Sequence, residues 1–267
     1  MTSSNNTNAV LRYGAYVCFA PAGPSAYALL DAPIPEVAER FGLENEFSAQ
    51  DGHPLHALAF LRRIDATVRD VPDRGLMEAV AVVHVASDRA ALVDEFCDAV
   101  RHLVDRTSIT RVLQGVVRPP RYTGAAMHEF AYARQVTQQS GPVAPHAFLV
   151  PMMKTAEWWK KDWMARHTYF LPRFDDQGHM VSEGHALAAA AGIPCLMRRT
   201  YKNLAEPAPK GEYDFINYFE CAQKNVQTFH SVCASLRDVA RNPEWRFVRE
   251  GATWHGERVA TWRELFR

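Results

Sequence analysis

Along the C-terminal half, short runs of apolar residues alternate with stretches in which apolar residues recur at helical spacing. Short runs rich in apolar, aromatic and β-branched residues predict strands. These runs are 146–152, 195–201, 213–221 and one that starts at 245–248. Between them, a helical stretch with an alanine-rich end is stopped by Gly192 and Pro194. A second helix is predicted from an apolar stripe at three- and four-residue spacing, formed by Val226, Phe229, Cys233, Leu236 and Ala240.

The N-terminal half repeats the order. Strands are predicted at 12–19, 58–68, 77–86 and 110–117. A helix broken by two prolines is predicted over 25–43, and a second helix is capped by Asp88 and carries Leu92, Phe96, Val100 and Leu103. Each half therefore has the β-α-β-β-α-β order of a ferredoxin-like unit. We predict an α+β fold with an N-terminal unit over 1–125, a linker over 126–145 and a C-terminal unit over 146–267, their sheets packed face to face.

Composition and charge narrow the function classes. The chain has 267 residues, 48% of them hydrophobic, with 30 basic and 30 acidic residues interspersed. The absence of a basic block argues against nucleic acid or an anionic membrane as a partner. Residues 1–8 lack the features of a secretory signal, and no apolar run approaches the roughly 20 residues that span a bilayer. We therefore expect a cytoplasmic protein.

Cysteine and histidine spacing excludes several kinds of site. The 5 cysteines contain no C-x-x-C pair, which argues against structural zinc and a disulfide framework. His53 and His56 lie in a Gly/Pro loop without a third ligand nearby, and His230 borders an apolar stripe. We interpret the first two as a solvated turn and His230 as a core or boundary residue. The chain has no glycine-rich phosphate loop and no G-x-S-x-G or H-E-x-x-H pattern.

His185 has a different context. It is followed by small residues on a predicted helix, which leave room for a large flat cofactor. Arg198 and Arg199 follow on a predicted strand, where one of the two must face each side of the sheet. An imidazole and a guanidinium facing one cavity would suit a haem iron with an anionic ligand. In the alternative interpretation, these side chains only pack or face solvent.

Residues 148–201 and 213–250 resemble the catalytic domain of the chlorite dismutase family, which includes coproheme decarboxylases and is akin to Dyp-type peroxidases. The resemblance covers most of the C-terminal half, whereas the N-terminal half is similar only in layout. It implies a dimeric α+β barrel, haem b and a homopentamer. The matching segments, in order, are PMMKTAEWW (151–159), His185, RRTY (198–201), DFINYFE (214–220), SLRDV (235–239) and RFVREG (246–251).

The resemblance implies a role for each matching residue. His185 matches the proximal haem ligand and Arg198 the distal arginine, which would hold an anionic substrate and its departing anion by charge-assisted hydrogen bonds. Lys154, with Trp158 or Trp159, matches residues that pack on the haem edge and hold a propionate. Phe219 matches an aromatic residue of the distal wall. Asn217 stands beside the distal arginine, where these enzymes usually have a threonine. Their proximal carboxylate would fall near Arg241, and Glu244 is the carboxylate close by.

Three functions stay open. The first is chlorite decomposition to chloride and dioxygen. The second is other haem chemistry of the family: peroxidase-type oxidation of a peroxide-like substrate, coproheme decarboxylation, or dehydration or rearrangement of a small nitrogenous substrate. Decarboxylation requires a redox-active tyrosine, for which Tyr201, Tyr213 and Tyr218 are candidates. The third is a ferredoxin-like binding protein without haem. An extra segment of about 14 residues follows the tryptophan pair and is absent from most of the family. Its sequence is KDWMARHTYFLPRF.

Overall fold

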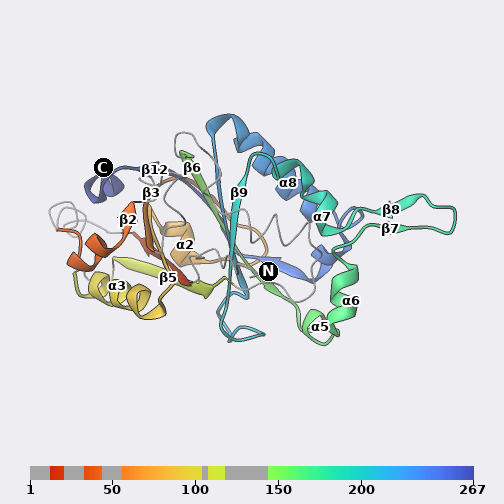
Figure 1. Cartoon of the computed structure of the whole chain (residues 1–267), viewed down its shortest axis with the longest axis horizontal. Coiled ribbons are helices and arrows are strands. Elements are labelled where there is room, and N and C mark those ends of the chain that lie inside the picture. Colours follow the sequence, from red (N-terminus) through yellow and green to blue (C-terminus); the bar gives the residue numbers. More distant parts are fainter. Residues whose placement is uncertain (1–12, 21–32, 44–55, 104–107, 118–143) are drawn as a thin grey trace, which may run out of the picture.

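The structure is a computed structural model that describes residues 13–20, 33–43, 56–103, 108–117 and 144–267 (Figure 1). Most of the described strands form one large mixed sheet. Its members are β1 (Tyr13–Phe19), β2 (Gly42–Leu43), β3 (His56–Thr67), β4 (Ala81–Ser87), β5 (Ile109–Val116), β6 (His146–Lys154), β9 (Met197–Lys202), β10 (Phe215–Cys221), β11 (Val248–Glu250) and β12 (Thr253–Val259). The short hairpin of β7 (Arg173–Phe174) and β8 (Met180–Ser182) stands apart from this sheet.

The order of hydrogen-bonded strands shows two ferredoxin-like sheets joined into a closed barrel. One sheet runs β5-β1-β4-β3 and the other β12-β6-β10-β9, and both orders are 4-1-3-2 within their unit. The two sheets meet edge to edge where β5 pairs with β9 and where β12 pairs with β3. The pairing of β6 with β10 completes the ring. The α+β fold and the dimeric α+β barrel predicted from the sequence are confirmed.

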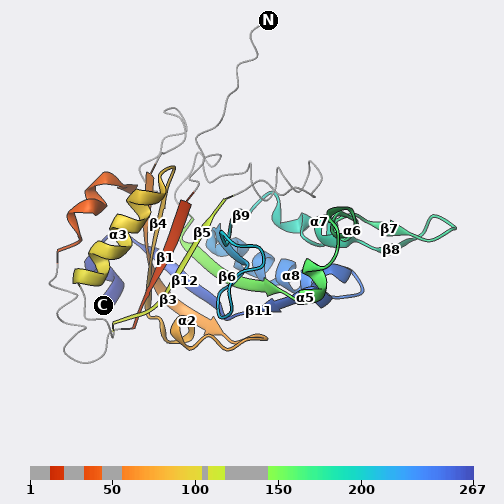
Figure 2. The same cartoon turned by 90° about the horizontal axis from the view of Figure 1, so that it is seen from below.

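Helices cover the two outer faces of the barrel (Figures 1 and 2). The longest are α3 (Ala90–Leu103) over the first sheet and α8 (Val226–Arg237) over the second. Strand residues alternate between these outer clusters and an inner cluster between the sheets, because successive side chains point to opposite faces. The shorter helices are η1 (Glu36–Arg40), α2 (Arg74–Glu78), α5 (Ala156–Trp159), α6 (Trp163–Thr168), α7 (Gly184–Ala188), η5 (Ala190–Gly192), η6 (Gln223–Asn225), η7 (Pro243–Phe247) and η8 (Trp262–Phe266).

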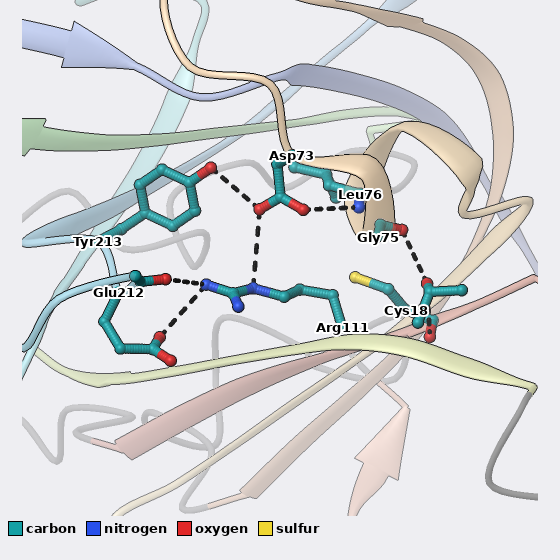
Figure 3. Close-up of polar contacts among 9 residues, drawn as sticks. Cys18, Asp73, Gly75, Leu76, Arg111, Glu212 and Tyr213 are labelled. Atoms are coloured by element: carbon teal, nitrogen blue, oxygen red, sulfur yellow. Dashed lines mark hydrogen bonds and ion pairs between the residues drawn. The ribbon is translucent and has the colours of Figure 1, made fainter.

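A polar cluster ties the loop after β9 to the first unit (Figure 3). The Tyr213 hydroxyl donates to Asp73 Oδ2 at 2.9 Å, and Arg111 on β5 donates to the Gly211 carbonyl at 2.9 Å. Asp73 also accepts from the Leu76 amide at 3.0 Å, which caps α2. Burial and the charge of Asp73 raise the pKa of Tyr213, so its hydroxyl remains a donor. The cluster fixes one unit against the other beside α2.

Several predicted elements differ in detail. Met77 lies in α2, and the third strand of the first unit begins only at β4. Trp245 lies in η7 instead of a strand, because Pro243 begins a helical turn and extended structure resumes at β11. Ala240 lies beyond the end of α8. His53 and much of the predicted broken helix and linker lie outside the described residues, and the predicted domain bounds stay a prediction.

None of the helices within the described ranges is long and apolar enough to cross a membrane.

Candidate functional site

His185 and Glu244 form a buried pair where α7 meets η7. His185 lies on α7, and Glu244 lies on η7, 59 residues later. His185 Nδ1 is 2.6 Å from Glu244 Oε2, and the side chains are 9% and 4% exposed. Burial alone would raise the pKa of Glu244, but the charge of Lys154 and the hydrogen bond from His185 lower it to about 2. The carboxylate is therefore ionised and can only accept.

This pairing determines which nitrogen of His185 carries the proton. Burial lowers the pKa of His185, and the positive charge of Arg198 lowers it further, against the opposing effect of Glu244. The imidazole is therefore neutral, and its one proton must lie on Nδ1, facing the carboxylate. Nε2 consequently carries a lone pair. It is buried and has no hydrogen-bond partner among the described residues.

Lys154 at the end of β6 is the second partner of Glu244. Its ammonium contacts Glu244 Oε1, the side chain is 4% exposed, and its nitrogen lies 4.3 Å from the centroid of the Trp158 ring. Burial lowers the pKa of Lys154, and the charge of Glu244 opposes this. The structure thus directs Lys154 to the carboxylate that holds His185. The propionate contact expected from the resemblance stays a prediction.

The segment between the tryptophan pair and His185 supports the short helix α7. Backbone carbonyls of Tyr169 and Phe170 accept hydrogen bonds from the amides of His185 and Ala186, each at 3.3 Å. The Phe170 ring lies 5.3 Å from the His185 ring. Gly184 has a φ of +67°, and a Cβ at this position would come within 2.5 Å of a backbone carbonyl oxygen of this segment. Only glycine therefore allows the chain to turn into His185 at this close approach.

Arg198 on β9 faces the same side of the second sheet as His185. Its Nη2 donates to Asn217 Oδ1 on the neighbouring strand at 2.9 Å. Its guanidinium lies 5.6 Å from the centroid of the Phe219 ring, which is 5% exposed. Arg199, by contrast, points between the sheets toward the Tyr201 hydroxyl at 3.5 Å. The two arginines therefore face opposite sides, as the strand period requires.

Trp158 and Trp159 occupy different environments. Trp158 is fully buried on α5 and packs against Tyr169 and Phe247. Trp159 is half-buried, and its ring is parallel to that of Phe215 at a centroid distance of 6.5 Å. The Lys154 ammonium lies over the Trp158 ring, and the Arg166 guanidinium lies over the Trp159 ring at 5.0 Å from its centroid. Their predicted cofactor contact stays a prediction.

One observation shows that these residues suit a haem: Nε2 of His185 is buried and has no hydrogen-bond partner among the described residues. A neutral imidazole whose Nδ1–H is held by a carboxylate would offer Nε2 as a ligand to the haem iron. Within the described ranges, no three His, Cys, Asp or Glu residues are grouped so that they could hold a metal ion. The side chains that the structure brings together on this face are His185, Glu244, Lys154, Arg198, Asn217 and Phe219.

The barrel and its His–Glu pair define the class of protein, an α+β barrel with a polar site on one outer face. This fold is that of the chlorite dismutases. A double mutant of chlorite dismutase from Candidatus Nitrospira defluvii aligns with a TM-score of 0.62 at 18% identity, over 96% of this chain and 94% of that chain. The imidazole complex of chlorite dismutase from that organism gives 0.61 at 18% identity over the same shares.

A dimeric chlorite dismutase from Nitrobacter winogradskyi also aligns, with a TM-score of 0.51 at 19% identity over 75% of this chain and 99% of that chain. At these identities the likeness shows the fold. No protein-family model and no curated protein matches the chain by sequence.

Sequence reasoning pointed to most of these residues but missed two features. Phe170 and the backbone of Tyr169 gave no signal, because their contacts with α7 depend on how the segment folds back. Thr200, which donates to Asn217 Oδ1 at 2.8 Å, was also missed. Alternation along β9 offered a signal, since Thr200 has the same parity as Arg198. Glu244, the carboxylate that the sequence offered close to Arg241, does reach His185.

Proposed function

We propose that this chain is a haem-dependent oxidoreductase that binds haem b through His185 and decomposes chlorite to chloride and dioxygen. The observation that carries the proposal is His185 itself. Its Nδ1 is held by an ionised carboxylate, and its Nε2 is buried without a partner in the described part of the chain. The chlorite dismutase fold supports it over nearly the whole chain.

Haem b would supply a redox-active iron that takes oxygen from chlorite. The protein's own residues would then perform three tasks. His185 would ligate the iron through Nε2, and Glu244 would keep the proton on Nδ1, where its negative charge makes the imidazole a stronger donor. Arg198 would bind the chlorite anion and retain the departing anion, because its guanidinium stays protonated at any working pH. Phe219 would shield this side from water.

Lys154 acts in this proposal through Glu244. A lone carboxylate buried at this depth would tend to take up a proton, which would weaken its hold on the imidazole. The ammonium of Lys154 keeps Glu244 ionised. We therefore assign Lys154 as a positioning residue for His185.

Decarboxylation through the three candidate tyrosines is disfavoured by their placement. Tyr201, Tyr213 and Tyr218 all belong to the cluster between the two sheets. The residues beside His185 and Arg198 belong instead to the outer cluster under α8, which includes Phe219. The other haem chemistries of the second hypothesis remain the alternative that the experiment must separate. The predicted homopentamer and cytoplasmic location stay predictions.

The deciding experiment is dioxygen release from chlorite by the haem-reconstituted protein, followed with an oxygen electrode. We expect release that requires haem and is lost in Arg198→Ala, which should still bind haem. His185→Ala should lose stable haem binding, measured by the Soret band and haem-to-chain stoichiometry. The matched control is His102→Ala, an exposed histidine on α3. Uptake of one haem per chain without dioxygen release would favour the second hypothesis, and no haem uptake would favour the third.

A further inference from the structure

Arg241 lies in the turn between α8 and η7 and contacts the start of α7 in two ways. Its backbone carbonyl accepts hydrogen bonds from the amides of Glu183 and Gly184, at 2.9 and 3.0 Å. Its guanidinium donates from Nε and Nη2 to the two carboxylate oxygens of Glu183, each at 2.9 Å. Arg241 therefore holds the start of α7 through its main chain and through its side chain.

The carbonyl contact satisfies amides that the short helix α7 leaves without a partner. The first amides of a helix have no acceptor within the helix itself. Glu183 occupies the N-cap position of α7, but its side chain makes no cap hydrogen bond and pairs with Arg241 instead. The group that caps α7 thus lies 58 residues away from Glu183, in the segment that leads to Glu244.

The two segments that Arg241 joins carry the two members of the buried pair. His185 comes directly after Gly184, and Glu244 follows Arg241 within the same turn. The turn itself is fixed, because Asn242 is fully buried and its Nδ2 donates to a carbonyl in the last turn of α8 at 2.9 Å. With so little chain on either side, the contacts of Arg241 set how closely Glu244 Oε2 approaches His185 Nδ1, a distance of 2.6 Å.

We propose that Arg241 is a positioning residue that holds α7 so that the His185 imidazole keeps its hydrogen bond to Glu244. The inference rests on the proposed function, because this hydrogen bond matters for the strength of His185 as an iron ligand. Arginine suits the task because its planar fork binds both oxygens of a carboxylate, whereas the ammonium of lysine acts as a point charge. The Arg241 and Glu183 side chains are 47% and 27% exposed, so salt can screen this contact.

Hydrogen exchange of the haem-free full chain, measured by mass spectrometry, tests the contact without haem. We expect Arg241→Met to speed exchange of the α7 amides about fivefold, the upper range for an exposed ion pair, and to leave α3 unchanged. Arg40→Met is the matched control, because Arg40 is also 47% exposed and pairs with Glu95 at 2.7 Å. Unchanged exchange of α7 in Arg241→Met, or an equal increase in α3, would overturn the proposal.

A charge reversal separates the ion pair from the bulk of the arginine side chain. Arg241→Glu brings two carboxylates together and should speed exchange of α7 more than Arg241→Met does. The double variant Glu183→Arg/Arg241→Glu restores opposite charges, and exchange of α7 should return close to that of the unmodified chain. Exchange in the double variant as fast as in Arg241→Glu would contradict the proposal.

The iron–histidine stretching frequency of the ferrous haem protein, measured by resonance Raman, reports the donor strength of His185. We expect a lower frequency in Arg241→Met, because a longer hydrogen bond to Glu244 makes the imidazole a weaker donor, and no change in Arg40→Met. An unchanged frequency in Arg241→Met would show that Arg241 steadies α7 without setting the buried pair, which refutes the inference. Failure of the proposed function would show differently, as absence of haem uptake by the unmodified chain.

Discussion

Replacing Glu244 with Gln leaves the Lys154 ammonium buried beside a neutral amide, and we expect a large loss of stability. Lys154 and Glu244 are each 4% exposed, so water cannot replace the lost charge. Removing one partner of a buried ion pair costs about 3–5 kcal/mol. The lowered pKa of Glu244 agrees in direction, because the charge of Lys154 opposes protonation of the buried carboxylate.

The assay is urea unfolding of the apoprotein at pH 7, followed by circular dichroism. Glu244→Gln should lower the free energy of unfolding by about 3–5 kcal/mol. The double variant Lys154→Met/Glu244→Gln should recover most of this loss, because no buried charge remains and the glutamine oxygen can still accept from His185. Lys154→Met alone is the matched single variant. A loss below about 1 kcal/mol in Glu244→Gln, or no recovery in the double variant, would refute this reasoning.

Three further predictions follow from the same structure. Burial lowers the pKa of His185 in the folded protein, so on acidification the unfolded chain takes up a proton at this residue before the folded chain does. The free energy of unfolding of the apoprotein should therefore fall as the pH drops below about 6.5, and it should fall more steeply than in His185→Gln. Urea titrations at several pH values measure this. Gly184→Ala should destabilise the protein by more than about 2 kcal/mol and weaken haem uptake, whereas Gly178→Ala, with φ +83° and open space around it, should cost only about 1–2 kcal/mol. Tyr213→Phe should cost about 1–2 kcal/mol by leaving Asp73 with one donor fewer, and a change below the error of thermal unfolding would contradict the role of the cluster.

Periodicity determined most of the fold before any contact was known. Strand alternation along β9 already required that Arg198 and Arg199 face opposite sides, because the side-chain period of a strand is two residues. The apolar stripe of α8 required a sheet beneath it. The repeated order of elements gave two like units whose uncovered sheet faces had to be buried against each other.

The local sequence was less decisive where short elements compete. Met77 carries an apolar, strand-like pattern but lies in α2, because Asp73 caps a helical turn there. Trp245 has high strand propensity, yet Pro243 begins a 3-10 turn that places Glu244 under α7. A helix of five residues such as α7 has too few positions for a period to be recognised.

Only the tertiary structure decided how the site is assembled. Glu244 follows His185 by 59 residues, and no period or spacing sets the 2.6 Å contact between them. The same holds for Lys154, whose ammonium turns to Glu244, and for Asn217, whose amide is oriented by donors and acceptors on two other strands. The sequence determines which chemical groups are present and which face of an element they occupy. Their pairing arises when burial forces each polar group to find a partner, and that choice depends on distances set by the whole barrel.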